Sequence, residues 1–177
     1  MSFLPRIPPP SSSTGPMYGT DLDRAIAAFA AAAMRASSVD AIAGELLRLR
    51  CARYHDCRRC GALRNAVALE DGIDESFFAK IDDYERSDLD DRFKVVLRLT
   101  DAMITHPGSL DDRLRRDLHK HFSDQQIVEM TLDIMKYSYQ KVMVALRLEA
   151  PPGDGLRALT FDAEGKAKIG DPIVAVG

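Results

Sequence analysis

The chain has 177 residues, 46% of them hydrophobic and 29% charged, which are the proportions of a globular protein. Its net charge of −3 at pH 7 shows no excess of basic residues, so we expect no nucleic-acid partner. No stretch approaches the roughly 20 apolar residues needed to cross a bilayer, and the Pro-rich start has no apolar core of signal-peptide length. Composition therefore predicts a cytoplasmic protein that has no membrane partner.

Three regions differ in composition. Residues 1–17 are rich in Pro and Ser, which predicts a disordered or arm-like segment. Residues 18–150 carry helical hydrophobic periodicity and are expected to form one domain. Residues 151–177 are a C-terminal extension in which apolar residues flank Gly165, so we expect a small hairpin or an extended tail.

Helix start and stop signals divide the middle region into about seven helical segments. The predicted helix starts are Asp21, the residue after Ser38, Asp56, Asp74, Ser87, Ser109 and Ser123. The segment after Asp56 is expected to end before Gly72, and His106-Pro107-Gly108 should stop the one after Ser87. The last and longest run is expected to extend to Leu148. Many helices with short connections predict an all-α helical bundle.

Cys57 and Cys60 are the most informative residues of the chain. Side chains three residues apart on a helix lie on one face, about 5–6 Å apart at Cβ, so this pair can approach disulfide geometry. The first turn of a helix favours a thiolate, because free N–H groups and the positive end of the helix dipole lie there. Nearby arginines act in the same direction, whereas Glu45 and Asp56 oppose it, so the sign of the pKa shift stays open.

Two other interpretations of this pair were weighed. Cysteines also fill helix faces as small hydrophobic residues, and that is how we interpret Cys51. Zinc would need two further ligands, and Cys51 and His55 alone would strain to complete a tetrahedron. We therefore expect no metal and no cofactor.

The spacing Glu45-x11-Cys57-x2-Cys60 resembles the active-site motif of the alkyl hydroperoxidase D-like (carboxymuconolactone decarboxylase) superfamily. The resemblance extends from Asp21 to Leu148 and includes a long closing helix after Phe122-Ser123-Asp124. It implies an oligomeric helical fold, and a peroxidase whose disulfide is reduced by a dithiol. It further implies Cys60 as the residue that becomes a sulfenic acid, Cys57 as its resolving and proton-donating partner, and Glu45 as a base.

The sequence departs from the family at the histidines of its proton relay. Arg64 stands where the family has a histidine, and Arg59 stands between the cysteines where some members have another. An arginine cannot take up a proton near neutral pH, although it can hold a thiolate or an anionic substrate. His55 is a candidate replacement base, against the plainer interpretation of a solvent-exposed histidine at a helix end. We therefore expect weak peroxidase turnover.

Two alternative functions stay open. A decarboxylase-type enzyme would act on a carboxylated lactone, which Arg59 or Arg64 would hold through its carboxylate. That branch of the family does not need the cysteine pair. The other alternative is a non-catalytic oligomeric binding module that kept the fold and lost the relay.

Overall fold

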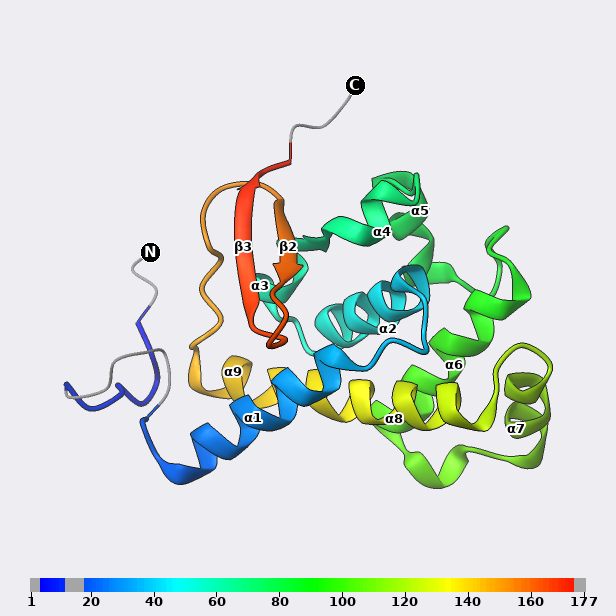
Figure 1. Ribbon diagram of the computed structural model, residues 1–177, viewed down its shortest axis with the longest axis horizontal. Coiled ribbons are helices and arrows are strands. Elements are labelled where there is room, and N and C mark those ends of the chain that lie inside the picture. The colour runs from blue at the N-terminus through cyan, green and yellow to red at the C-terminus, as the bar shows by residue number, and fades with distance from the viewer. Residues whose placement is uncertain (1–3, 12–17, 174–177) are drawn as a thin grey trace.

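The structure is a computed structural model that describes residues 4–11 and 18–173 (Figure 1). Helices dominate the described ranges, and a small sheet stands at one end. The α-helices are α1 Asp21–Arg35, α2 Ala41–Tyr54, α3 Arg58–Gly61, α4 Ala66–Glu70, α5 Glu75–Ala79, α6 Asp91–Thr105, α7 Asp112–His119, α8 Asp124–Ser138 and α9 Gln140–Leu146. Two 3-10 turns are Lys80–Asp83 and Pro107–Ser109, and the strands are β1 Leu63–Asn65, β2 Arg157–Phe161 and β3 Ala167–Pro172. The prediction of a predominantly helical fold is confirmed.

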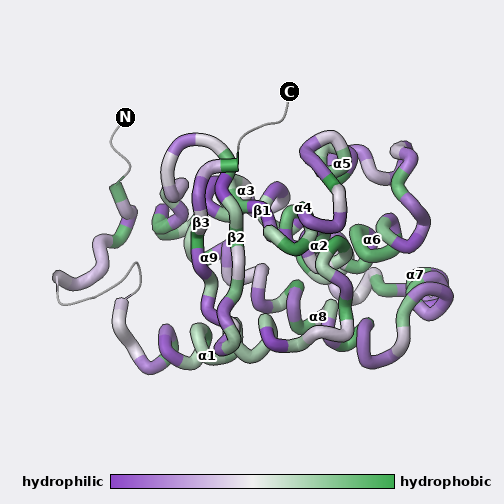
Figure 2. The backbone as a smooth tube through the Cα atoms, turned by 45° about the horizontal axis from the view of Figure 1, so that its top comes forward, coloured by the Kyte–Doolittle hydropathy of each residue, from purple (hydrophilic) through white to green (hydrophobic). Residues whose placement is uncertain are grey.

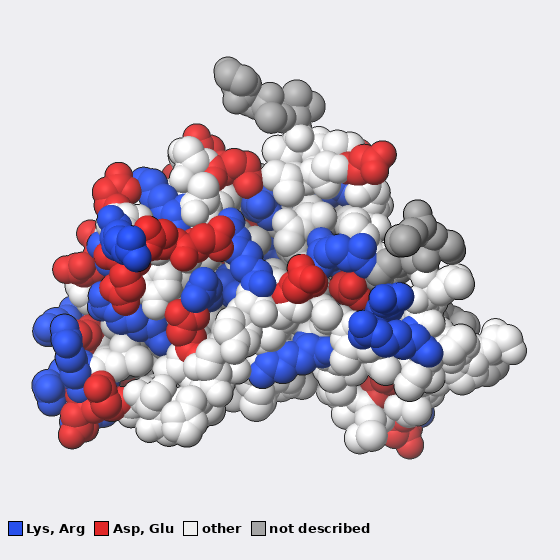
Figure 3. All heavy atoms as spheres, turned by 180° about the vertical axis from the view of Figure 1, so that it is seen from behind, with Lys and Arg blue, Asp and Glu red and all other residues white. Residues whose placement is uncertain are grey.

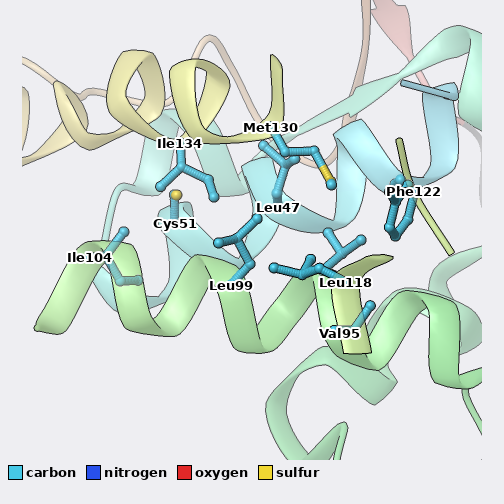
Figure 4. Close-up of a cluster of buried hydrophobic side chains, with 11 residues drawn as sticks. Leu47, Cys51, Val95, Leu99, Ile104, Leu118, Phe122, Met130 and Ile134 are labelled. Atoms are coloured by element: carbon cyan, nitrogen blue, oxygen red, sulfur yellow. The ribbon is translucent and has the colours of Figure 1, made fainter. Parts of the chain in front are cut away.

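Helix α2 lies at the centre of the molecule, between α6 and α8 and below α4 (Figures 1 and 2). It has apolar residues on several sides, as a helix enclosed by neighbours requires. The core packed between α2, α6 and α8 is drawn in Figure 4, and its buried residues are Ala43, Leu47, Cys51, Val95, Val96, Leu99, Ile104, Leu118, Phe122, Met130 and Ile134. Because this core surrounds α2, it fixes the position of the chain that leaves the end of that helix.

Several helix ends lie where the sequence predicts them. Asp74 accepts from the backbone N–H groups of Ser76 and Phe77 at the start of α5. Ser123 and Gln126 form a complete capping box at the start of α8. Helix α6 ends at Thr105, and His106 caps it before Pro107. These signals are local, which is why sequence alone identifies them.

Three predicted helix starts are wrong by one to three residues. Asp90 rather than Ser87 caps α6, and Asp111 rather than Ser109 caps α7. In both cases a carboxylate nearer the helix takes the first free N–H groups. Asp56 has a φ of 55°, so it turns the chain, and Cys57 takes the cap position of α3.

The predicted single helix from Asp56 to Gly72 is also wrong. Strand β1 separates α3 from α4, because its residues pair in parallel with β2 from the C-terminal extension. A second interruption falls within the predicted run to Leu148, where α8 ends at Ser138 and α9 begins at Gln140. Arg147, at a φ of 56°, ends α9.

The C-terminal extension forms the predicted hairpin. Strands β2 and β3 pair antiparallel, and β1 joins β2 on its other edge to give the order β1-β2-β3. The turn of the hairpin reaches α1, where the Arg35 guanidinium donates to the Glu164 carbonyl at 2.8 Å. The extension therefore contacts both α1 and the chain that follows Cys60.

Replacing Gly165 with alanine is expected to loosen this contact. Gly165 has a φ of +78°, and a Cβ there would lie 2.2 Å from the Ala31 carbonyl oxygen. Gly155 has a similar φ of +72° but faces open space, so it isolates the cost of the backbone conformation. We expect Gly155→Ala to lower the free energy of unfolding by about 1 kcal/mol and Gly165→Ala by about 3 kcal/mol. Equal losses in denaturant titrations would contradict the close contact with α1.

The described part of the predicted N-terminal arm is tied to the end of α9. The Arg6 side chain donates to the carbonyls of Val144 and Ala145, and its backbone N–H donates to Leu146. Residues 1–3 and 12–17 of the predicted arm lie outside the described residues. The described ranges contain no helix with both the length and the apolar character of a bilayer span.

Charged side chains of both signs gather over the end of the molecule that holds α5, α6 and α7 (Figure 3). Pairs such as Arg98 with Glu85 and Lys120 with Asp117 lie at that end. The cysteine pair lies toward the opposite end, near the hairpin.

Candidate active site around Cys57 and Cys60

The cysteine pair occupies a tight turn at the end of α2. The Cys57 N–H donates to the Ala52 carbonyl at 2.8 Å, so the turn is fixed to the last turns of that helix. Cys57 caps α3, and its Sγ accepts from the Cys60 N–H at 3.4 Å. The two cysteines come within 2.6 Å of each other and are not bonded. This arrangement needs little movement to form a disulfide.

The surroundings make the two thiols unequal. The Cys60 thiol donates a hydrogen bond to Cys57, and together with the Cys60 N–H this lowers the pKa of Cys57 although burial opposes it. The same thiol–thiol hydrogen bond, followed by burial, raises the pKa of Cys60. Cys57 is therefore the more acidic thiol, as its place at the helix start suggests.

Access to the two thiols runs in the opposite order. Cys57 is only 2% exposed, whereas Cys60 is partly exposed and lines a pocket of about 660 Å³. This pocket lies between α1, the α8–α9 segment and the C-terminal hairpin, and most of its wall is apolar. Its apolar lining includes Ala27, Ala30, Ala31, Met34, Leu63, Tyr137, Tyr139, Met143, Leu159 and Phe161. A small molecule that enters it meets Cys60.

Glu45 lies on α2 and is completely buried, and both of its carboxylate oxygens are engaged by Arg48. The Arg48 Nε and Nη2 atoms each donate to the carboxylate at 2.6 Å, and the Asn65 N–H donates to it at 3.0 Å. Arg48 is itself only 3% exposed. Sequence reasoning overlooked Arg48, although an arginine three residues after a glutamate in an apolar helix is a recognisable signal.

Arg48 also ties the cysteine turn to α2. Its Nη1 donates to the Cys60 carbonyl at 2.8 Å, and its Nη2 donates to the Leu63 carbonyl at 2.6 Å. Burial alone would lower the pKa of Arg48, but the charge of Glu45 raises it above the ordinary value of arginine. The positive charge is therefore permanent, and it favours a thiolate on either cysteine.

The two arginines that the sequence singled out, Arg59 and Arg64, lie in different surroundings. Arg59 lines the pocket together with Cys60. Arg64 is buried and does not line it. Its guanidinium donates to both oxygens of Glu75, at 2.5 and 2.8 Å, and lies 5.5 Å from the centre of the Phe78 ring. The Arg64 cation is therefore bonded to the Glu75 carboxylate and not to a group in the pocket.

His55 caps the end of α2 and is partly buried rather than exposed to solvent. Both ring nitrogens are inaccessible and have no hydrogen-bond partner of good geometry among the described residues. Burial lowers the pKa of His55, the charge of Lys141 adds to that effect, and Gln140 opposes it. His55 is therefore neutral near pH 7.

Cys51 belongs to the core between α2, α6 and α8, as the sequence predicts (Figure 4). Burial raises its pKa to about 12, so it stays a thiol near neutral pH. In the described part of the chain, no three His, Cys, Asp or Glu side chains are grouped as metal ligands would be.

Comparisons with known proteins give two kinds of relative, and no protein-family model matches the chain. Two uncharacterised proteins of Mycobacterium tuberculosis, MT2376 (strain CDC 1551 / Oshkosh) and Rv2313c (strain ATCC 25618 / H37Rv), are 38% identical to it over 143 residues, which cover 78% of this chain. The match covers 50% of each of those proteins, so the chain spans about half the length of the curated relatives it matches.

Among solved structures, the chain is similar to the crystal structure of ATU0492 of Agrobacterium tumefaciens, a protein of unknown function with the proposed name antioxidant defence protein AhpD. It superposes with a TM-score of 0.62 at 22% sequence identity, and the match covers 76% of this chain and 92% of that one. At this identity the likeness establishes the fold. The helical core around α2 therefore has the alkyl hydroperoxidase D-like fold.

Proposed function

We propose that the chain is a thiol-dependent peroxidase in which Cys57 and Cys60 form a reversible disulfide. The observation that carries this proposal is the pairing of an accessible thiol with a buried, more acidic one. Cys60 lines the large pocket, and Cys57 lies behind it within disulfide reach. We assign the chemistry to residues 18–150 and regard residues 151–177 as an extension whose hairpin walls the pocket.

The reaction would begin when Cys60 passes its proton to the Cys57 thiolate and attacks the peroxide. The O–O bond breaks, Cys60 becomes a sulfenic acid, and the departing alkoxide takes the proton from Cys57 and leaves as an alcohol. The Cys57 thiolate then attacks the sulfenic sulfur, the S–O bond breaks as the disulfide forms, and the leaving hydroxide becomes water with the proton released when the dithiol first ionised. A dithiol would restore both thiols, and we place the protein in a reducing compartment such as the cytoplasm.

Glu45 has a supporting role in this scheme. Its carboxylate is occupied by Arg48 and the Asn65 N–H, so it acts by holding Arg48 against the cysteine turn. Arg59 is available to attract an anionic group at the pocket. Arg64 stands where the family has a histidine. Because its guanidinium is bonded to Glu75, this position supplies no proton donor.

The apolar pocket favours organic hydroperoxides over hydrogen peroxide. Burying an apolar group in such a pocket contributes roughly 25 cal/mol per Å², and hydrogen peroxide has no apolar surface to bury. We expect cumene hydroperoxide to oxidise the cysteine pair with a second-order rate constant at least about tenfold higher than hydrogen peroxide. Stopped-flow thiol titration measures both rates. Equal rate constants would show that the pocket does not select the peroxide.

One observation favours the second candidate, an enzyme acting on a carboxylated lactone. Arg59 lines the pocket together with Cys60, and its guanidinium can bind a carboxylate. Such an enzyme would consume the lactone in a Cys57→Ser variant, whereas a thiol peroxidase would not turn over in that variant. A protein that consumes neither compound would be a binding module.

We further propose a homo-oligomer, which light scattering at micromolar concentration tests.

A further inference from the structure

Glu149 is a buried carboxylate beside the cysteine turn that the scheme above leaves without a role. It follows α9, is 4% exposed, and its Oε1 accepts from Arg58 at 3.3 Å. The Oε2 atom is also buried, and no residue of the described ranges hydrogen-bonds to it. A buried charged oxygen without a partner is costly, so folding alone does not account for its presence.

The backbone fixes Glu149 next to the cysteine pair. Its carbonyl oxygen accepts from the Arg59 N–H at 3.0 Å, within the first turn of α3. The side chain reaches Arg58, which follows Cys57 directly. The carboxylate acts electrostatically on the Cys57 thiol and raises its pKa, against the hydrogen bonds that lower it. Arg48 is the cation that acts on the same thiol from α2.

The two side chains at the family's relay positions, Glu45 and Arg64, are engaged elsewhere. Glu45 is held by Arg48, and the Arg64 guanidinium is bonded to Glu75. The Glu149 Oε2 atom, by contrast, has no hydrogen-bond partner among the described residues, so it is free to accept a proton.

We propose that Glu149 accepts the proton of Cys57 and later returns it, in place of the relay histidines that this sequence lacks. This inference rests on the proposed thiol chemistry. As the dithiol ionises, the Cys57 S–H bond breaks and its proton passes to the Glu149 Oε2. When Cys57 later attacks the Cys60 sulfenic acid, the S–O bond breaks and the S–S bond forms. Glu149 then returns its proton to the leaving hydroxide, so water departs and the carboxylate is restored.

Glu149→Gln tests this role, because it keeps the size of the side chain and removes its ability to carry a proton. We expect disulfide formation with cumene hydroperoxide at pH 7 to be about 10²-fold slower than in the wild type. The rate should rise more steeply with pH in the variant, since hydroxide takes over the removal of the proton. Glu149→Asp should recover part of the rate. Quenched-flow mass spectrometry of the full chain gives the rates, and circular dichroism verifies the fold.

Glu85→Gln is the matched control, because Glu85 also pairs with an arginine, Arg98 of α6, but does not line the pocket that holds Cys60. Its rate should equal that of the wild type. The proposal is overturned if Glu149→Gln matches the wild type. It is also overturned if both Glu149 variants are equally slow with the wild-type pH profile, since that indicates a structural role.

Oxidation by diamide separates this proposal from the proposed function. Diamide forms the same disulfide without a peroxide. If the wild type reacts with diamide but not with hydroperoxides, the peroxidase proposal fails, and the diamide rates of the Glu149 variants still decide the role of Glu149 by the same criteria.

Discussion

Cys60→Ser is expected to abolish the hydroperoxide-dependent oxidation of the protein, with a loss of turnover of more than about 10³-fold. Serine keeps the shape of the side chain but is a far weaker nucleophile near neutral pH. Cys60 is the thiol of the pair that lines the pocket, whereas Cys57 is 2% exposed. Acidity alone would select Cys57, because the Cys60 thiol and N–H lower its pKa. Access to the peroxide decides against it.

Trapping the sulfenic acid tests this assignment directly. In Cys57→Ser the disulfide cannot form, so dimedone should label Cys60 after one equivalent of hydroperoxide. In Cys60→Ser no label should appear on Cys57. Labelling of Cys57 alone would reverse the two roles, and a wild type that forms no intramolecular disulfide would defeat the redox proposal.

Cys51→Ala is the control for these thiol measurements. Cys51 is fully buried and burial raises its pKa to about 12, so it should stay unlabelled in every variant. The Cys51→Ala protein should oxidise at the wild-type rate. Since Cys51 lies in the core between α2, α6 and α8, its removal should affect stability rather than reactivity.

Arg48→Met is expected to lower the free energy of unfolding by about 3–5 kcal/mol. The substitution leaves the Glu45 carboxylate buried without its cation, in a place where water cannot replace it. It also removes the donors to the Cys60 and Leu63 carbonyls. The loss is therefore larger than the value of the ion pair, because unpaired buried groups remain. Urea titration followed by circular dichroism measures it.

Arg50→Met provides the comparison. Arg50 lies two residues further along α2 and pairs with Asp101, but that pair is partly exposed. Its loss should cost about 1 kcal/mol. The double change Glu45→Gln with Arg48→Met should recover part of the stability lost in Arg48→Met, since no uncompensated charge remains. Similar losses in Arg48→Met and Arg50→Met would contradict the burial of the Glu45–Arg48 pair.

The sequence by itself determined the features that depend on neighbouring residues. Amphipathic spacing predicted the helical fold, and local caps predicted the starts of α5 and α8. The Gly165 turn between apolar residues predicted the hairpin. The three-residue spacing of Cys57 and Cys60 predicted that the two side chains lie close together, because residues three apart share one side of a helical turn.

Tertiary structure decided the features that depend on partners distant in the chain. Strand β1 replaces predicted helix because β2, more than 90 residues later, supplies its hydrogen bonds. Arg64 is directed away from the pocket by Glu75, and Cys60 is accessible because the hairpin and α1 leave a pocket beside it. Glu149 reaches the cysteine turn only through the path of the chain after α9. Local sequence carries no record of such contacts, since each depends on how packing brings separate elements together.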